Sequence, residues 1–229
     1  MNKNEFRVGI EVGGTFTDLV ASDGYRMKTA KVPSTPSNPD EGAMNAIRAA
    51  ELDISKIKEL VHGSTVATNA VLERKGGRIC FFVTKGTRDI LLLQRHDRRS
   101  IYDLHYKKPE PVVARHDTYE IKERISADGS IVLEIDKDHA RQQVKTALRD
   151  GRFDSAAICF LHSYTNSQHE GVLKELIQQE FPSLPITCSC DVTREFREYE
   201  RASTTTLAAY VQPVIAGYIK RFSASLAEQ

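Results

Sequence analysis

The chain has 229 residues, of which 40% are hydrophobic and 28% are charged, enough for one large domain or two small ones. Its 32 Lys and Arg residues balance 31 Asp and Glu residues, and the net charge of +1 gives no long-range attraction to nucleic acid or anionic membrane. No apolar run approaches the roughly 20 residues of a spanning helix, and the polar N-terminus lacks a signal-peptide core. We therefore expect a cytoplasmic protein that binds neither nucleic acid nor membrane.

The first part of the chain predicts a β-hairpin opening followed by alternating helices and strands. Alternating β-branched residues indicate the strands, and the turn pairs Gly13-Gly14 and Asp23-Gly24 separate them. A rigid polar connector at 33–39 precedes the first helix. The predicted order is strand 7–12, strand 15–21, strand 25–32, helix 40–52, helical turn 53–58, strand 59–63, helix 65–75, strand 78–84 and helix 87–93.

The second part begins with a long charged excursion at 94–117, a length that is usually functional or an interface. The elements predicted beyond it are a hairpin of strands 119–125 and 130–133, helix 136–150, strand 155–161, helix 167–181, strand 185–190, and a long helix 198–226 that is bent or interrupted near Pro213. This order predicts a layered α/β domain rather than a helix bundle or a sandwich.

The four cysteines are interpreted as structural thiols. Cys80 and Cys159 lie inside apolar runs, as small buried residues do. Cys188 and Cys190 are spaced C-x-C, which is not the C-x-x-C of zinc or redox sites. The seven histidines show no tight ligand spacing either, so neither residue type predicts a metal site.

The segment 9–18 (GIEVGGTFTD) predicts a phosphate-binding turn between two strands. Successive glycines allow backbone N–H groups to point into one concavity that binds phosphate oxygens. The acids beside the turn are candidate Mg²⁺ ligands, because Mg²⁺ accepts one or two carboxylates together with phosphate. The candidates are Gly13, Gly14, Thr15 and Thr17 for the phosphate, and Glu11 and Asp18 for catalysis and the metal. The segment matches neither a Walker A loop nor a dinucleotide fingerprint, and a plain hairpin is the alternative.

The segment 62–69 (HGSTVATN) places polar side chains where a predicted strand meets the start of a helix, a place that favours anions. Helix capping by Ser64 or Thr65 is the alternative. Capping does not explain Thr68 and Asn69, which are poorer helix formers one turn further on. We therefore expect a substrate to contact Ser64, Thr65, Thr68 and Asn69.

Two charged segments are weaker candidates. Arg88, Asp89 and Arg95 either line a cleft and contact substrate or belong to a solvated loop. A nucleic-acid patch of Arg95, Arg98 and Arg99 is disfavoured, because few aromatic residues are interleaved with it. In the segment 194–206, alternating charges indicate a solvated helix face, whereas the hydroxyl run at 203–206 indicates a packed or ligand-facing surface.

Taken in order, these segments resemble the hydantoinase A / 5-oxoprolinase family. GIEVGGTFTDLV is similar to its opening motif, and further similar blocks follow. They are HGSTVATNAVLERKG, TKGTRDIL, IYDL, YEIKERI, CFLHSYTNSQHE and REYERASTTTLAAYVQP. Any one block is weak evidence, but the ordered set covers nearly the entire chain and is specific.

The resemblance implies an α/β fold that is an actin/sugar-kinase-like nucleotide-binding half, with a mixed sheet flanked by helices and a β-hairpin start. It implies a ribonuclease-H-like core around 5–95, an inserted or second α/β part around 96–195 and a long C-terminal helix at 198–228. The second half of such a subunit is expected to be absent from this chain, either by truncation or because the gene is short.

The function implied by the resemblance is that of the ATP-binding subunit of a cyclic-amide hydrolase acting on hydantoin, oxoproline or a lactam. Such an enzyme phosphorylates a carbonyl oxygen with MgATP, and a hydantoinase B-type subunit or domain completes the reaction. The fragment alone is expected to be inactive. The alternatives are a subunit of an ATP-dependent ketone carboxylase, a small-molecule kinase of the same fold, and a non-catalytic fragment that docks a partner subunit.

The sequence departs from the family pattern at several positions. The first acid is usually Asp and here is Glu11, whose extra methylene moves the carboxylate by roughly a bond length. Ala208 stands where the family often has Asn. Four residues of the segment 85–96 also differ from those that the family often has: Thr87, Leu92, Gln94 and His96. We expect these differences to mark a different substrate.

Overall fold

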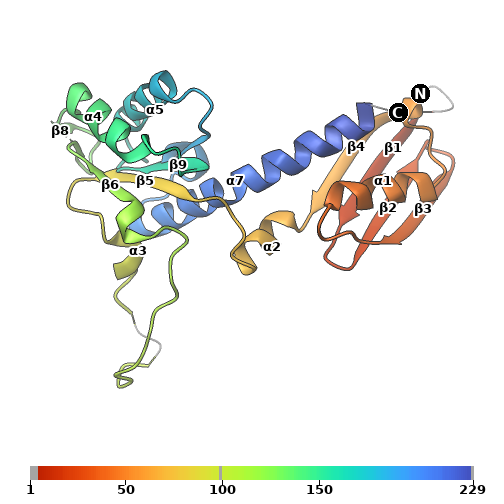
Figure 1. Ribbon diagram of the computed structural model, residues 1–229, viewed down its shortest axis with the longest axis horizontal. Coiled ribbons are helices and arrows are strands. Elements are labelled where there is room, and N and C mark those ends of the chain that lie inside the picture. Colours follow the sequence, from red (N-terminus) through yellow and green to blue (C-terminus); the bar gives the residue numbers. More distant parts are fainter. Residues whose placement is uncertain (1–4, 98–99, 228–229) are drawn as a thin grey trace. The chain divides into compact units, whose positions relative to one another are not determined.

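The computed structural model describes residues 5–97 and 100–227, which divide into two compact units (Figure 1). Unit 1 comprises the chain up to Lys75 together with the segment from Val214 onward. Unit 2 comprises Gly76–Pro213. Helix α7 (Glu198–Ala227) contributes its first part to unit 2 and its last part to unit 1.

Unit 1 is built on a four-stranded mixed sheet with the strand order β3-β2-β1-β4. The first three strands form an antiparallel meander, and β4 lies parallel to β1 on its other side. Asp23 shapes the second turn, because its carboxylate accepts hydrogen bonds from the backbone N–H groups of Tyr25 and Arg26. The elements are β1 (Phe6–Val12), β2 (Phe16–Ser22), β3 (Met27–Pro33), α1 (Pro39–Ala49), η1 (Ile54–Lys56), β4 (Ile57–Ser64) and α2 (Val66–Leu72).

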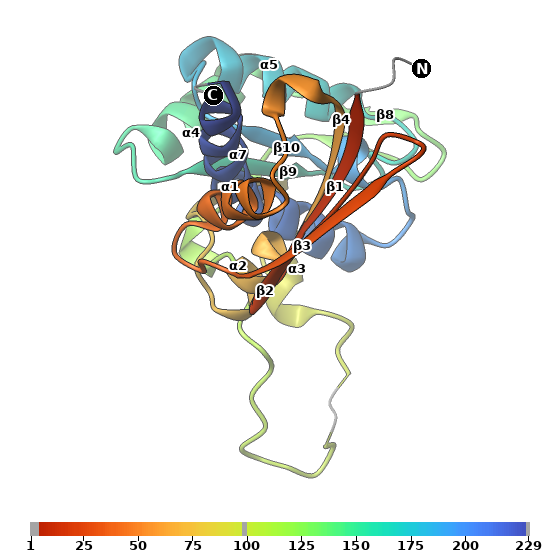
Figure 2. The same cartoon turned by 90° about the vertical axis from the view of Figure 1, so that its right-hand side faces the viewer.

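The alternation of side chains decides which face of this sheet is buried. Along β1, Val8, Ile10 and Val12 are buried, and α1 covers this face (Figure 2). The helix supplies Ala43, Met44, Ala46 and Ile47 to the same core, and Phe222 of α7 joins them. The intervening residues of β1, including Glu11, are exposed on the other face.

Unit 2 is built on a parallel sheet with the strand order β10-β9-β5-β6. The central strands β5 and β9 are buried at every position, as the continuous apolar run of β5 predicts. Helices α4 and α5 pack on the sheet, and the Ser155 hydroxyl donates to the Ala209 carbonyl of α7 at 2.8 Å. The strands are β5 (Ile79–Thr84), β6 (Thr118–Ile121), β9 (Ser155–Cys159) and β10 (Ile186–Cys188).

The remaining elements of unit 2 connect these strands. Asp136 caps α4 by accepting hydrogen bonds from two N–H groups of its first turn. The two-stranded hairpin β7–β8 stands apart from the main sheet. These elements are α3 (Ile90–Leu93), η2 (Arg115–Asp117), β7 (Arg124–Ile125), β8 (Ile131–Leu133), α4 (Lys137–Leu148), α5 (Gln168–Glu180) and α6 (Ser189–Val192).

Most predicted elements are present within a few residues, but three predictions were wrong in part. The predicted strand 119–125 is two strands, because β6 joins the buried edge of β5 and only β7 pairs with β8. The strand predicted at 185–190 ends at Cys188, where α6 begins. The long helix was predicted to be bent or interrupted near Pro213, and the interruption is wrong, because α7 is continuous across this residue.

The division into units also differs from the expected grouping of residues 5–95 as one core. Strand β5 belongs to the sheet of unit 2 rather than to that of unit 1. The end of α7 returns to unit 1, where Phe222 packs in the core. Arg98 and Arg99, which were considered as a basic patch, lie outside the described residues.

Candidate functional site

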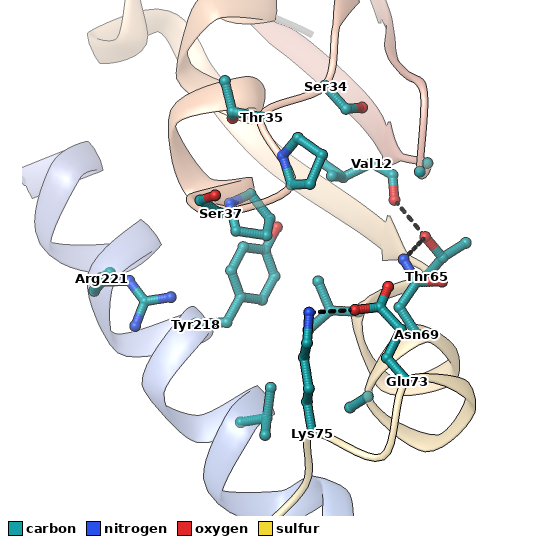
Figure 3. A pocket seen from close by; sticks show the side chains of 17 residues that line it. Val12, Ser34, Thr35, Ser37, Thr65, Asn69, Glu73, Lys75, Tyr218 and Arg221 are labelled. Carbon is teal, nitrogen blue, oxygen red and sulfur yellow. Dashed lines mark hydrogen bonds and ion pairs between the residues drawn. The ribbon is translucent and has the colours of Figure 1, made fainter.

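Unit 1 contains a cavity of about 300 Å³ (Figure 3), a volume at the lower end of the range for small-molecule sites. Four segments that are far apart in the sequence form its wall: the turn after β1, the connector before α1, the helix α2 with the loop that follows it, and α7. Polar residues from each segment line it, including Gly13, Gly14, Ser34, Thr35, Thr65, Asn69, Lys75, Tyr218 and Arg221.

The glycine turn lies at the cavity, but it is not the open nest that the sequence predicted. Gly13 and Gly14 both line the cavity. The N–H of Gly13 donates to the carbonyl of Phe16 at 3.0 Å, which closes the hairpin and leaves this donor engaged. A side chain at Gly13 would press on that carbonyl, whereas Gly14 has open space around it. Of the two glycines, Gly14 is therefore the one whose N–H makes no backbone hydrogen bond within the described residues.

The two threonines of the opening motif do not line the cavity. Thr17 is fully buried, and its hydroxyl lies 3.0 Å from the Ser34 hydroxyl. It faces the α1 side because β2 alternates its side chains, so it packs within unit 1. Thr15 is exposed, and its carbonyl accepts a hydrogen bond from the N–H of Ser34. Both residues therefore connect the hairpin to the connector that forms the next part of the wall.

The junction of β4 and α2 contributes two of its four candidate residues to the cavity. Thr65 and Asn69 line it, one helical turn apart, and the Thr65 hydroxyl also donates to the carbonyl of Val12. Ser64 is exposed and accepts a hydrogen bond from the N–H of Val66, as a residue at a helix start does. Thr68 is exposed and does not line the cavity.

Helix α7 supplies the wall that the sequence did not predict. Tyr218 and Arg221 line the cavity, although Tyr218 lies 156 residues beyond His62 and still further from the glycine turn. The Tyr218 hydroxyl is hydrogen-bonded to Nε2 of His62, and Nε of Arg221 donates to the carboxylate of Asp40 at 3.2 Å. Burial raises the pKa of Tyr218 to about 12, so its hydroxyl stays protonated at neutral pH.

His62 is the histidine of this site, and its ring packs against the rings of Tyr218 and Phe222. Burial lowers the pKa of His62, and the charge of Glu11 and the carbonyl of Ile10 oppose this only in part. The neutral imidazole is therefore the form that the fold favours. The sequence included His62 in the motif but did not assign it a role.

The two candidate acids lie on the exposed face of the sheet rather than in the cavity. Glu11 and Asp18 are direct cross-strand neighbours, so both carboxylates project from the same face. The Glu11 carboxylate lies against Gly63, where any side chain would collide with it. Asp18 forms an ion pair with Lys31 at 2.9 Å.

Two carboxylates side by side are a donor set that fits Mg²⁺ with phosphate. Lys31 would have to release Asp18 for both acids to bind a metal, whereas Glu11 has no such competitor among the described residues. Those residues contain no group of three or more His, Cys, Asp or Glu side chains arranged for a metal ion.

The candidates from the charged segments belong to unit 2 and form ion pairs. Asp89 accepts two hydrogen bonds from Arg115, which lowers its pKa. Arg88 donates to the carbonyl of Arg115, and Arg95 pairs with Glu200 of α7. Contact of these three residues with a substrate stays a prediction. None of the helices within 5–97 and 100–227 is long and apolar enough to cross a membrane.

These features define an α/β protein with a small-molecule cavity beside its opening hairpin, and comparisons with known proteins narrow the class. The crystal structure of the ATP-dependent caprolactamase from Pseudomonas jessenii superposes with a TM-score of 0.84 at 30% identity. The match covers 97% of this chain and 34% of that chain. The predicted fold class, a mixed α/β fold with flanking helices and a hairpin start, is confirmed.

The family model described as the hydantoinase/oxoprolinase N-terminal region matches residues 7–181. The chain belongs to this family, as its ordered motifs indicate.

Two further relatives resemble the chain over most of its length. A protein of Methanocaldococcus jannaschii is 38% identical over 96% of this chain and 33% of its own length. The acetophenone carboxylase gamma subunit of Aromatoleum aromaticum is 32% identical over 90% of this chain and 31% of its own length. The chain thus spans about a third of the length of each protein that it matches here.

Proposed function

We propose that this chain is the N-terminal, nucleotide-binding portion of the ATP-dependent subunit of a cyclic-amide hydrolase. The complete subunit would use MgATP to phosphorylate the carbonyl oxygen of a hydantoin, oxoproline or lactam. A hydantoinase B-type subunit or domain would then complete ring opening in the cytoplasm. Family membership and the 30% identity to an ATP-dependent caprolactamase support this assignment.

The observation that carries the proposal is the cavity beside the glycine turn. Its wall combines the N–H of Gly14 with hydroxyl and amide groups of Thr65 and Asn69. These groups suit a small polar ligand that carries a carbonyl or a phosphoryl group. We assign nucleotide contact to the glycine turn and substrate contact to Thr65 and Asn69.

The proposed chemical step is the transfer of the γ-phosphoryl group of ATP to the carbonyl oxygen. The carbonyl oxygen forms a bond to the γ-phosphorus, and the bond from that phosphorus to the bridging oxygen of ADP breaks. The chain's contribution is to position the reactants and to stabilise charge, which supplies most of the catalysis in phosphoryl transfer. Mg²⁺ held near Glu11 and Asp18 would neutralise the phosphate oxygens.

A ketone carboxylase subunit is the second candidate function, and the 32% identity to the acetophenone carboxylase gamma subunit favours it. The same phosphoryl transfer would then activate a ketone as its enol, and bicarbonate would supply the carboxyl carbon. Two assays of the complete enzyme distinguish the candidates. Ring opening of a cyclic amide without bicarbonate supports the hydrolase, and incorporation of labelled bicarbonate into a ketone supports the carboxylase.

Substitution of Glu11 in the complete subunit, assayed together with a B-type partner, tests the proposed site. Glu11→Gln keeps size and hydrogen bonding but removes the charge. We expect ATP-dependent turnover to fall roughly 100-fold or more, whereas stability changes by less than about 1 kcal/mol because the side chain is exposed. Glu59→Gln is the matched control, because Glu59 is an exposed acid on the neighbouring strand β4 that forms an ion pair with the exposed Arg7.

Turnover of Glu11→Gln within a few-fold of the unsubstituted enzyme would reject a catalytic role for this acid. Glu11→Asp then asks whether the site has adapted to the longer acid. A rise in activity marks Glu11 as a weakened version of the family's acid, and a fall shows that the surrounding residues are matched to it. The 229-residue chain alone should show no complete turnover, and steady ATP-dependent ring opening by it would contradict this.

A further inference from the structure

Arg221 points from α7 toward the unit 1 cavity, and only one edge of its guanidinium is engaged (Figure 3). Its Nε donates to Oδ1 of Asp40 at 3.2 Å. Within the described residues, Nη1 and Nη2 make no hydrogen bond or ion pair. About half of the side chain, 54%, remains exposed. The fork of the guanidinium is therefore available to a ligand.

Asp40 fixes the position of this arginine. It lies in the first turn of α1, and its side chain is only 11% exposed. A carboxylate held in this way orients one edge of a guanidinium and leaves the other edge to bind a second partner. Preorganisation of this kind lowers the entropy that a flexible arginine loses when it binds a ligand.

The charges in the rest of the cavity wall balance each other. The other two charged side chains in the wall, Glu73 and Lys75, lie close together, and Lys75 forms an ion pair with Glu73 at 2.6 Å. Thr65 and Asn69 add neutral hydrogen-bonding groups to the same wall. Arg221 is thus the cation of the wall that is not matched by an acid within the wall itself. A planar guanidinium fork binds carboxylate and phosphate oxygens in pairs.

We propose that Arg221 binds an oxyanion in this cavity and that Asp40 is its positioning residue. The oxyanion is either a phosphoryl group of the nucleotide or a carboxylate carried by the cyclic amide. This inference rests on the proposed function, because that function brings both groups to the cavity. It assigns a recognition role to α7, which lies outside the segment matched by the family model.

The test uses the complete subunit with its B-type partner and the variants Arg221→Gln, Arg221→Lys and Asp40→Asn. Arg7→Gln is the matched control, because Arg7 is an exposed arginine of unit 1 that is also paired with one acid. Calorimetry measures the binding of pyrophosphate and of MgADP. Steady-state kinetics compares 5-oxoproline, which carries a carboxylate, with its uncharged counterpart 2-pyrrolidinone.

If the anion is phosphoryl, Arg221→Gln weakens pyrophosphate and MgADP binding roughly tenfold or more. If the anion is the substrate carboxylate, KM rises by a similar factor for 5-oxoproline and not for 2-pyrrolidinone. Arg221→Lys should recover only part of the loss, because lysine lacks the fork. Asp40→Asn alone should weaken anion binding several-fold. In a chain that already carries Arg221→Gln, it should weaken binding no further.

The inference is overturned if Arg221→Gln matches Arg7→Gln in every one of these measurements. It is also overturned if the unsubstituted subunit binds neither pyrophosphate nor MgADP and does not distinguish the two lactams. A subunit that binds pyrophosphate through Arg221 but turns over no substrate with ATP would count against the proposed function alone. Different results therefore reject the role of Arg221 and the proposed function.

Discussion

Glu170→Gln in α5 should be far more destabilising than the removal of any surface charge. Glu170 and Arg201 are both fully buried in unit 2, and Nη2 of Arg201 lies 3.7 Å from Oε1 of Glu170. The Glu170 carboxylate also accepts four hydrogen bonds, which join α5 to the end of β9 and to α6. The donors are the N–H of Phe160 at 2.9 Å, the hydroxyls of Ser163 at 2.7 Å and Ser189 at 2.6 Å, and the N–H of Cys190 at 3.1 Å.

The magnitude follows from what remains after the substitution. Arg201 keeps its hydrogen bond to the carbonyl of Phe160 but is left as a buried charge with no counter-charge. Removal of one partner of a buried pair costs about 3–5 kcal/mol. The new amide also presents its own donors to groups that need an acceptor, which adds to the cost. Glu59→Gln, which breaks an exposed pair in unit 1, should cost less than about 1 kcal/mol.

Urea unfolding of the chain measures both variants, and hydrogen exchange of the amides in β9 and α5 assigns the loss to unit 2. The double variant Glu170→Leu with Arg201→Met removes both charges together. It should be clearly less destabilised than the sum of the two single variants, since neither charge is left unpaired. If Glu170→Gln costs no more than Glu59→Gln, the pair does not stabilise unit 2 and the reasoning is wrong.

Three further predictions test the site and its surroundings. In the native chain, Cys190 should react fastest with a thiol reagent. Burial raises the pKa of the Cys80 thiol and raises that of Cys159 to about 12, and a hydrogen bond with Cys190, together with burial, raises the pKa of the Cys188 thiol. Burial lowers the pKa of His62, so the unfolded state binds the proton more readily than the folded state does. The free energy of unfolding should therefore fall as the pH drops below about 6.5. His62→Gln should reduce this dependence on pH. Gly63→Ala should displace the Glu11 carboxylate and lower turnover of the complete enzyme roughly tenfold with little loss of stability, whereas Gly9→Ala, which meets only a carbonyl at 3.9 Å, should leave both unchanged.

The elements predicted well are those decided by local sequence. The run 78–84 is apolar throughout and became the buried strand β5. Asp136 precedes a helical pattern and caps α4 with two hydrogen bonds. The buried hydroxyls in α7 also follow the prediction of a packed surface, since Thr205 and Thr206 are buried and donate to carbonyls of the preceding turn.

The elements predicted poorly are those whose partners are distant in the sequence. Residues 118–121 became a strand of the main sheet because β5 offered a parallel edge, and nothing within the segment itself distinguishes this from a longer hairpin. The same holds for the cavity. Thr65 and Asn69 were found because their excess of polar groups is local, whereas Arg221 was missed because its partner Asp40 lies 181 residues away.

The alternation along β1 separates two features that the sequence motif presents as one. Val12 faces the α1 side and lines the cavity, whereas Glu11, one residue earlier, projects from the opposite face beside Asp18. A metal held by these acids would therefore meet the phosphate from the exposed face of the sheet, and Arg221 would meet its anion from the α7 side. The two contributions should be independent, so Glu11→Gln and Arg221→Gln should have additive effects on the free energy of activation within about 0.5 kcal/mol. Strong non-additivity, measured from kcat/KM of the double variant, would place both side chains on the same phosphoryl group.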